Sequence, residues 1–109
     1  MGRTEIPPGT LCMLILKSLA GLGPMHGFGI ARHIHEMSGE VLLVEEGSLY
    51  PALQRMLIKG WVAAEWKQSE NNRRARYYRL TAAGRNQLER EMREFERVMS
   101  AIVRVIEPA

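Results

Sequence analysis

Cysteine, aspartate and long apolar runs are scarce in this sequence. Cys12 is the single cysteine, so no disulfide can form within the chain, which suits a reducing cytoplasm. Cys12 lies in an apolar run, where a buried small hydrophobe is a better interpretation than a reactive thiol. No stretch reaches the roughly 20 apolar residues of a membrane span, and the first residues do not resemble a signal peptide. We therefore expect a cytoplasmic protein with no membrane partner.

Groups that carry catalysis or bind metals are also sparse. All twelve acidic residues are glutamate, and they show no acid–base pairing. His33 and His35 are two residues apart, so they point to different faces of a helix and make a poor metal pair. His26 precedes a glycine-containing segment, but this segment has neither a GxGxxG nor a Walker pattern. We expect no enzyme, no metal and no cofactor; a small enzyme or metal protein is the last alternative considered.

The spacing of apolar and turn-forming residues predicts four helices and one hairpin. At 109 residues, 46% hydrophobic and 25% charged, the chain has the size and composition of one globular domain. Residues 1–9 are interpreted as a flexible lead-in. The elements expected after them are a helix from Thr10 to Leu19, a helix Gly27–Met37, a short strand Val41–Val44, a helix Ser48–Ile58, strands Trp61–Lys67 and Ala75–Leu80, and a long helix from Thr81 to Ile106.

Three expectations concern helix ends and faces. Thr10, Ser48 and Thr81 are the predicted N-caps, because a hydroxyl can accept a hydrogen bond from the first turn. A cap at Ser48 would put Pro51 in the first turn, where its missing N–H costs little. Met37 is expected in the buried stripe of the second helix.

Three short helices followed by a hairpin is the order of a winged helix-turn-helix. We therefore predict a mainly α fold with a small β hairpin. Residues 1–80 would form a DNA-binding domain, and residues 81–109 a C-terminal dimerisation helix.

Positive charge is concentrated in the part of the chain that a winged helix presents to DNA. Residues 47–79 hold seven Lys or Arg and two Glu, whereas residues 81–109 hold five Arg and five Glu. Gln54 and Arg55 can read base edges in the major groove, and arginines around the hairpin tip can lie over the minor groove. The predicted DNA-binding residues are Ser48, Tyr50, Pro51, Gln54, Arg55, Lys59, Arg73, Arg74 and Arg76. The alternative is a winged helix used for protein–protein contact, with these side chains as ordinary solvated surface.

The last helix carries a heptad seam. Its apolar residues recur at spacings of four and three: Leu88, Met92, Phe95, Met99, Ile102 and Ile106. A helix of about 25 residues spans about 37 Å, which is more than a small three-helix body can cover. We predict that a second copy covers the seam, and that the homodimer places two recognition helices on the half-sites of a palindrome. The alternative is a helix that folds back on its own body.

Four segments together resemble the PadR family of bacterial transcriptional regulators over nearly the whole chain. The first, His26-Gly27-Phe28-Gly29-Ile30, opens the second helix. The others are Gly47-Ser48-Leu49-Tyr50-Pro51-Ala52-Leu53 at the recognition helix, Gly60-Trp61-Val62 at the first hairpin strand, and Arg76-Tyr77-Tyr78-Arg79-Leu80-Thr81-Ala82-Ala83-Gly84 at the end of the hairpin. The combination at this spacing is more specific than any one segment.

The resemblance implies a homodimer, joined through its C-terminal helix, that binds a palindromic operator and represses transcription. By motif position it implies DNA contacts from Ser48, Tyr50, Pro51 and Gln54. With one C-terminal helix, the chain resembles the short subfamily, whose multidrug-sensing members bind flat aromatic compounds between the subunits through a tryptophan on the last helix. Here Phe95 is the only aromatic residue of that helix, so the identity of any effector is left open.

Overall fold

The computed structural model describes residues 4–7 and 9–107. The helices are α1 (Leu11–Leu22), α2 (Gly27–Met37), α3 (Glu46–Ile58) and α4 (Ala82–Ile106). The strands are β1 (Thr4–Glu5), β2 (Met25–His26), β3 (Leu42–Leu43), β4 (Val62–Gln68) and β5 (Arg74–Leu80). The expected fold class, a winged helix-turn-helix with a long C-terminal helix, is thus confirmed.

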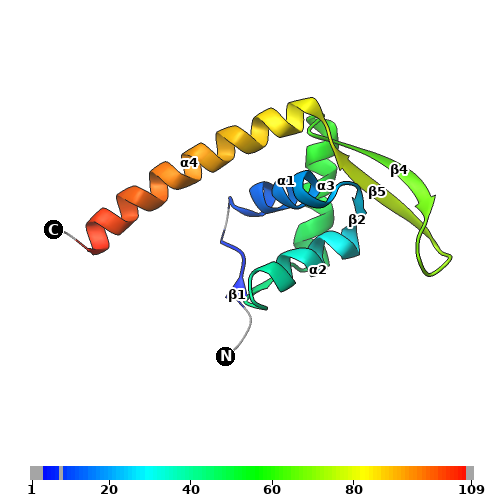
Figure 1. The fold of residues 1–109 in the computed structure, drawn as a ribbon, viewed down its shortest axis with the longest axis horizontal. Coiled ribbons are helices and arrows are strands. Elements are labelled where there is room, and N and C mark those ends of the chain that lie inside the picture. Colours follow the sequence, from blue (N-terminus) through cyan, green and yellow to red (C-terminus); the bar gives the residue numbers. More distant parts are fainter. Residues whose placement is uncertain (1–3, 8, 108–109) are drawn as a thin grey trace.

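Three helices form the body, and two projections extend from it (Figure 1). The β4–β5 hairpin, called the wing below, leaves the body on one side, and α4 runs out on the other. The wing pairs with β2 in an antiparallel sheet of order β2-β5-β4, so the sheet has one strand more than the sequence predicted. β2 is only two residues long, too short for its alternation to be recognised.

The core lies where the three body helices meet the root of the wing. Its largest fully buried side chains come from α1, α2 and α3: Ile15, Leu16, Ile30, Leu49, Leu53 and Met56. Tyr78 of β5 and Leu88 of α4 join this cluster. Burial of each large apolar side chain contributes about 1.5–3 kcal/mol. The first turns of α4 are therefore part of the body, and Leu88 packs within its own chain.

The start of α3 differs from the expectation. Glu45 is the N-cap residue and the helix begins at Glu46, so the predicted cap at Ser48 is wrong. Val44 is buried and anchors the chain just before the helix, while the amides of Ser48 and Leu49 already bond to the carbonyl of Glu45. Pro51 consequently lies in the helix interior, beyond the first turn.

Two further expectations were wrong because they depended on tertiary contacts. Thr4 and Glu5 were interpreted as part of a flexible lead-in, but they form β1, which pairs in parallel with β3. Residues 1–3 and 8 of that lead-in lie outside the described residues. Met37 was expected in a buried stripe, yet it is 74% exposed, since α2 ends there in a turn through Gly39 with φ of 68°.

The junction between α3, the wing and α4 is tightly bonded. Gly60, with φ of 77°, ends α3, and the amide of Trp61 donates to the carbonyl of Met56. The hydroxyl of Thr81 accepts from the amide of Gly84, which confirms the predicted cap, and donates to the carbonyl of Gly60. These bonds tie the start of α4 to the end of α3.

Candidate nucleic-acid interface

Helix α3 buries one face and exposes the other. Leu49, Ala52, Leu53 and Met56 lie in the core because they recur at helical spacing. All of the DNA-binding residues predicted on this part of the chain are exposed: Ser48, Tyr50, Pro51, Gln54, Arg55 and Lys59. The exposed face therefore carries the polar and basic side chains that the sequence analysis selected.

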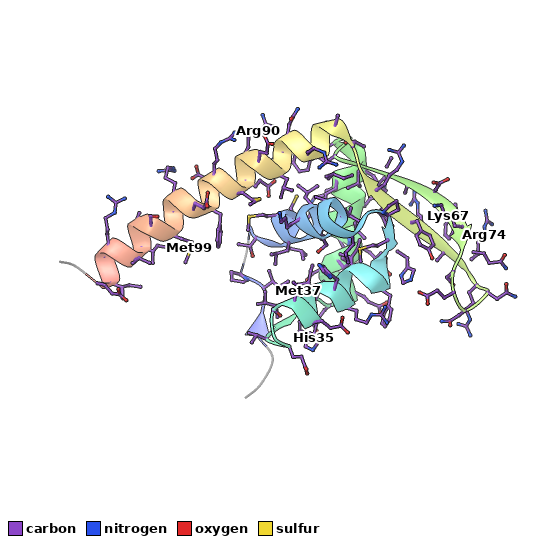
Figure 2. All side chains as sticks on the ribbon, in the orientation of Figure 1. His35, Met37, Lys67, Arg74, Arg90 and Met99 are labelled. Atoms are coloured by element: carbon purple, nitrogen blue, oxygen red, sulfur yellow. The ribbon has the colours of Figure 1, made fainter. Side chains whose placement is uncertain are left out.

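The wing presents one aromatic and basic face. Trp66 lies opposite Arg76, and Gln68 lies opposite Arg74, so these side chains share a face with the buried Tyr78. The guanidinium of Arg74 lies 5.2 Å from the centre of the Trp66 ring. Figure 2 shows Arg74 and Lys67 far out on the wing.

The hairpin tip is closed by backbone bonds. The amide of Asn72 donates to the carbonyl of Ser69, and the amide of Ser69 donates to the carbonyl of Arg73. Asn72 has φ of 60°, a conformation that asparagine tolerates better than most residues. Asn72 thus shapes the turn through its backbone conformation.

An open groove of about 710 Å³ lies between this face of the wing and the start of α2. We call it the wing–α2 groove. It brings Tyr50 together with three of the predicted arginines, Arg73, Arg74 and Arg76. It also adds three residues of α2 and its cap that sequence reasoning did not select: His26, Phe28 and Arg32.

Sequence reasoning missed these α2 residues because it treated that helix only as core. A signal was present: Phe28 and Arg32 are four residues apart and so adjacent on a helix surface. The ring nitrogen Nδ1 of His26 accepts a hydrogen bond from the amide of Gly29 and caps the helix. This bond places the remaining ring proton on Nε2 when the histidine is neutral.

Tyr50 lies against the first residue of α2. A Cβ atom built on Gly27 would lie 2.6 Å from the hydroxyl oxygen of Tyr50, so only glycine lets this ring lie there. Burial raises the pKa of Tyr50 above its usual value, and the nearby Glu46 and Tyr78 add to the effect. The hydroxyl thus keeps its proton at neutral pH and can donate a hydrogen bond, although Tyr50 is 42% exposed.

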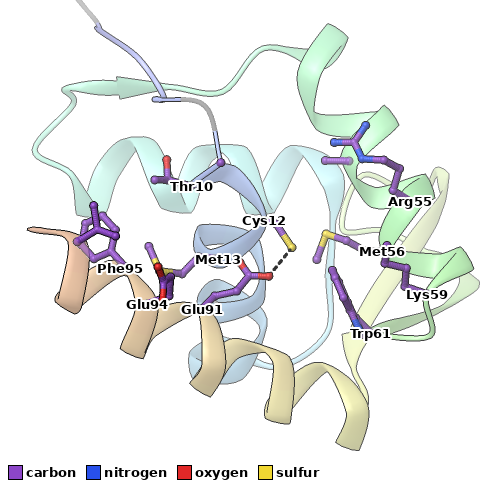
Figure 3. Close-up of a pocket in the computed structure, with 13 residues that line it drawn as sticks. Thr10, Cys12, Met13, Arg55, Met56, Lys59, Trp61, Glu91, Glu94 and Phe95 are labelled. Atoms are coloured by element: carbon purple, nitrogen blue, oxygen red, sulfur yellow. Dashed lines mark hydrogen bonds between the residues drawn. The ribbon is translucent and has the colours of Figure 1, made fainter.

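Other predicted residues lie away from the wing–α2 groove. Ser48 and Pro51 line a hollow of about 610 Å³ beside the N-terminal segment. Lys59 lines a third hollow of about 440 Å³ between α1, α3 and α4, and Arg55 lines both of these (Figure 3). Gln54 is exposed on α3 but does not line the groove. The predicted residues therefore lie on two sides of α3: Tyr50 lies with the wing arginines on one side, and Ser48, Pro51, Arg55 and Lys59 lie on the other.

The third hollow also contains Cys12 (Figure 3). Its thiol donates to Oε2 of Glu91 over 3.6 Å. Burial, with the neighbouring carboxylate of Glu91, raises the pKa of Cys12 to about 12. This supports the interpretation of Cys12 as an unreactive packing residue.

Beyond Leu88, the predicted seam of α4 is only partly covered by the described chain. Met99 is 41% exposed and Ile106 is 70% exposed. Met92, Phe95 and Ile102 are exposed to a similar degree as Met99. Figure 2 shows the Met99 side chain on the part of α4 that extends past the body.

Within the described residues, none of the helices combines the length and hydropathy that crossing a bilayer requires.

Known proteins match this chain in sequence and in fold. A 37.1 kDa protein of transposon TN4556 from Streptomyces fradiae is 41% identical over 90 residues, which are 83% of this chain. The chain spans only about a quarter of that relative, since the match covers 24% of its length.

Solved structures share the fold, including the following two. A transcriptional regulator from Clostridium thermocellum has a TM-score of 0.83 at 25% identity, over 91% of this chain and 95% of that one. Bacillus subtilis PadR in complex with operator DNA has a TM-score of 0.68 at 22% identity, over 79% of this chain and 48% of that one. The model of the transcriptional regulator PadR-like family matches residues 15–90, and the chain therefore belongs to the PadR-like family of transcriptional regulators.

Proposed function

We propose that this protein is a homodimeric, sequence-specific DNA-binding regulator that represses transcription from a palindromic operator. The observation that carries the proposal is the exposed, polar face of α3 beside a basic wing. This arrangement suits duplex DNA, since a helix fits the major groove while arginines approach the phosphates and the minor groove. A relative of the same fold, Bacillus subtilis PadR, is complexed with operator DNA.

Each part of α3 has a role in this proposal. Gly47 has no neighbour within 4 Å of a built Cβ, which leaves the backbone open to a close approach. Gln54, in the exposed middle of the helix, is the candidate for reading a base edge, and Arg55 flanks it.

Dimerisation through α4 supplies a second α3 helix for the second half-site of the DNA. The seam from Met92 to Ile106 is an apolar stripe whose exposure rises from 36% at Met92 to 70% at Ile106, and Figure 2 shows Met99 on the part of α4 that extends past the body. Apolar stripes of this length in water favour association with a second copy. We accordingly propose residues 1–80 as the DNA-binding unit and 81–109 as the dimerisation helix, with Leu88 anchoring that helix to its own body.

Selection of bound fragments from random duplexes tests the DNA-binding proposal. We expect an enriched inverted repeat, and an affinity for the selected duplex that falls steeply as salt rises. Tyr50→Ala and Arg74→Ala should each weaken binding without unfolding the protein. Absence of any enriched sequence, with binding indifferent to salt, would instead favour a protein–protein interaction module.

Light scattering tests the dimer. Met99→Glu should yield monomers, because it places a charge in the middle of the apolar seam. Ser100→Glu is the matched control, since it adds the same charge one residue away on the outer side of the helix. A dimer that persists in Met99→Glu at micromolar concentration would place the interface elsewhere.

A further inference from the structure

Two exposed aromatic rings line the wing–α2 groove, and each has an arginine over its face. Phe28 on α2 is 66% exposed, and the guanidinium carbon of Arg32 lies 5.7 Å from its ring centre. Trp66 on the wing is 56% exposed, and the guanidinium carbon of Arg74 lies 5.2 Å from its ring centre. The groove separates the two pairs, since one belongs to α2 and the other to the wing.

Stacking limits the freedom of each guanidinium. Phe28 and Arg32 are neighbours on one helix face, and Trp66 and Arg74 are diagonal neighbours on adjacent strands. An arginine attracted to an aromatic ring keeps its planar set of donors free at the edge. The two arginine side chains are therefore already restricted before a ligand binds, so binding costs them less conformational entropy.

The charge of the groove selects an anionic partner. Four arginines line it, Arg32, Arg73, Arg74 and Arg76, against one carboxylate, Glu70. Arginine donors match the geometry of phosphate oxygens. A partner with phosphates at regular intervals can meet both walls of the groove at once, and the sugar–phosphate backbone of duplex DNA is such a partner.

We propose that Arg32 and Arg74 form a clasp for the DNA backbone, and that Phe28 and Trp66 are positioning residues that hold the two guanidinium groups. The clasp rests on the proposed DNA-binding function and extends it to α2. It adds a phosphate-binding residue, Arg32, outside the recognition helix and the wing. Because phosphate contacts carry no sequence information, the clasp raises the affinity of the protein for operator and random duplexes alike.

Salt titration of duplex binding tests the two arginines. The slope of log affinity against log salt should become shallower by about 1 in Arg32→Ala and in Arg74→Ala. Arg79→Ala is the charge-matched control, because Arg79 is exposed on the other face of the same strand, and its slope should equal that of the wild type. An unchanged slope in Arg32→Ala overturns the clasp.

The aromatic variants test positioning. Phe28→Ala and Trp66→Ala keep both charges, so the slope should stay near the wild-type value while affinity falls about threefold to fivefold on operator and random duplexes alike. Phe28→Tyr and Trp66→Phe should restore the affinity. Full affinity in both alanine variants overturns the positioning role. Wild-type protein that binds no duplex at low salt would refute the proposed function itself, a result distinct from failure of the clasp alone.

Discussion

Gly84 lies where α4 begins, directly against the turn that ends α3, and the structure leaves no room there for a side chain. A Cβ atom at this position would collide with the carbonyl oxygen of Trp61 and approach Leu80 Cδ1 to 2.8 Å. The first obstacle is backbone and cannot rotate away. Gly84→Ala therefore requires α4 to move relative to the root of the wing.

The expected cost follows from what such a movement breaks. Overpacking a buried position costs about 1–3 kcal/mol. The carbonyl of Trp61 also accepts a hydrogen bond from the amide of Thr81, and a bond of this kind contributes about 1 kcal/mol. A total near 3 kcal/mol would lower Tm by about 15 °C in a domain of this size.

Thermal unfolding followed by circular dichroism, at one fixed protein concentration, measures this shift. Gly21→Ala is the control: Gly21 is exposed within α1, and a built Cβ has nothing within 4 Å. That substitution should raise Tm by a few degrees, because alanine is favoured over glycine in a helix by about 0.5–1 kcal/mol. Equal midpoints for Gly84→Ala and the wild type would contradict the close packing of α4 on the α3 turn.

Two further predictions concern contacts made by partly buried side chains. The thiol of Cys12, with its pKa raised to about 12 beside Glu91, should react with a disulfide reagent at pH 8 about a thousandfold more slowly in the folded than in the unfolded protein. A folded-state thiol that is labelled at the unfolded rate would contradict the burial. Since the unfolded thiol ionises near pH 9 and the folded thiol near pH 12, the free energy of unfolding should also fall as pH rises from 9 to 12. Gly27→Ala should displace the ring of Tyr50 and weaken operator binding about fivefold, with little change in Tm because that half-exposed ring can swing outward. In a Tyr50→Ala background the same change should have no further effect, and an equal loss in both backgrounds would refute the contact.

The sequence was most informative where a pattern repeats or a residue acts locally. The helical spacing of Leu49, Leu53 and Met56 predicted the buried face of α3, and Thr81 was correctly identified as a cap. Both depend on residues within a few positions of one another. The heptad spacing of α4 similarly predicted an apolar stripe, which the structure leaves exposed beyond Leu88.

The rest depended on contacts between distant segments. β1 exists because Thr4 and Glu5 meet β3, some forty positions later in the chain, and no local pattern shows this. The wing–α2 groove likewise joins residues of α2, α3 and β5, so the sequence shows Phe28 and Arg32 as helical neighbours but not their position beside the wing. Ser48 has a side chain suited to capping, but the helix begins two residues earlier, directly after the buried Val44 and the N-cap Glu45. The prediction considered the side chain alone and was therefore wrong.

The bonded junction at Thr81 connects the two halves of the proposed function. Its hydroxyl fixes Gly60 at the end of α3 and its amide bonds to Trp61, so α4 leaves the body in a direction set by the recognition helix. If two copies pair through α4, the same junction fixes the separation of their α3 helices. Recognition helices of a dimer must meet half-sites about one turn of DNA, roughly 34–36 Å, or a multiple of it apart. Under the proposed function, the start of α4 would therefore determine the preferred spacing of the operator, whereas the exposed face of α3 would determine the preferred bases.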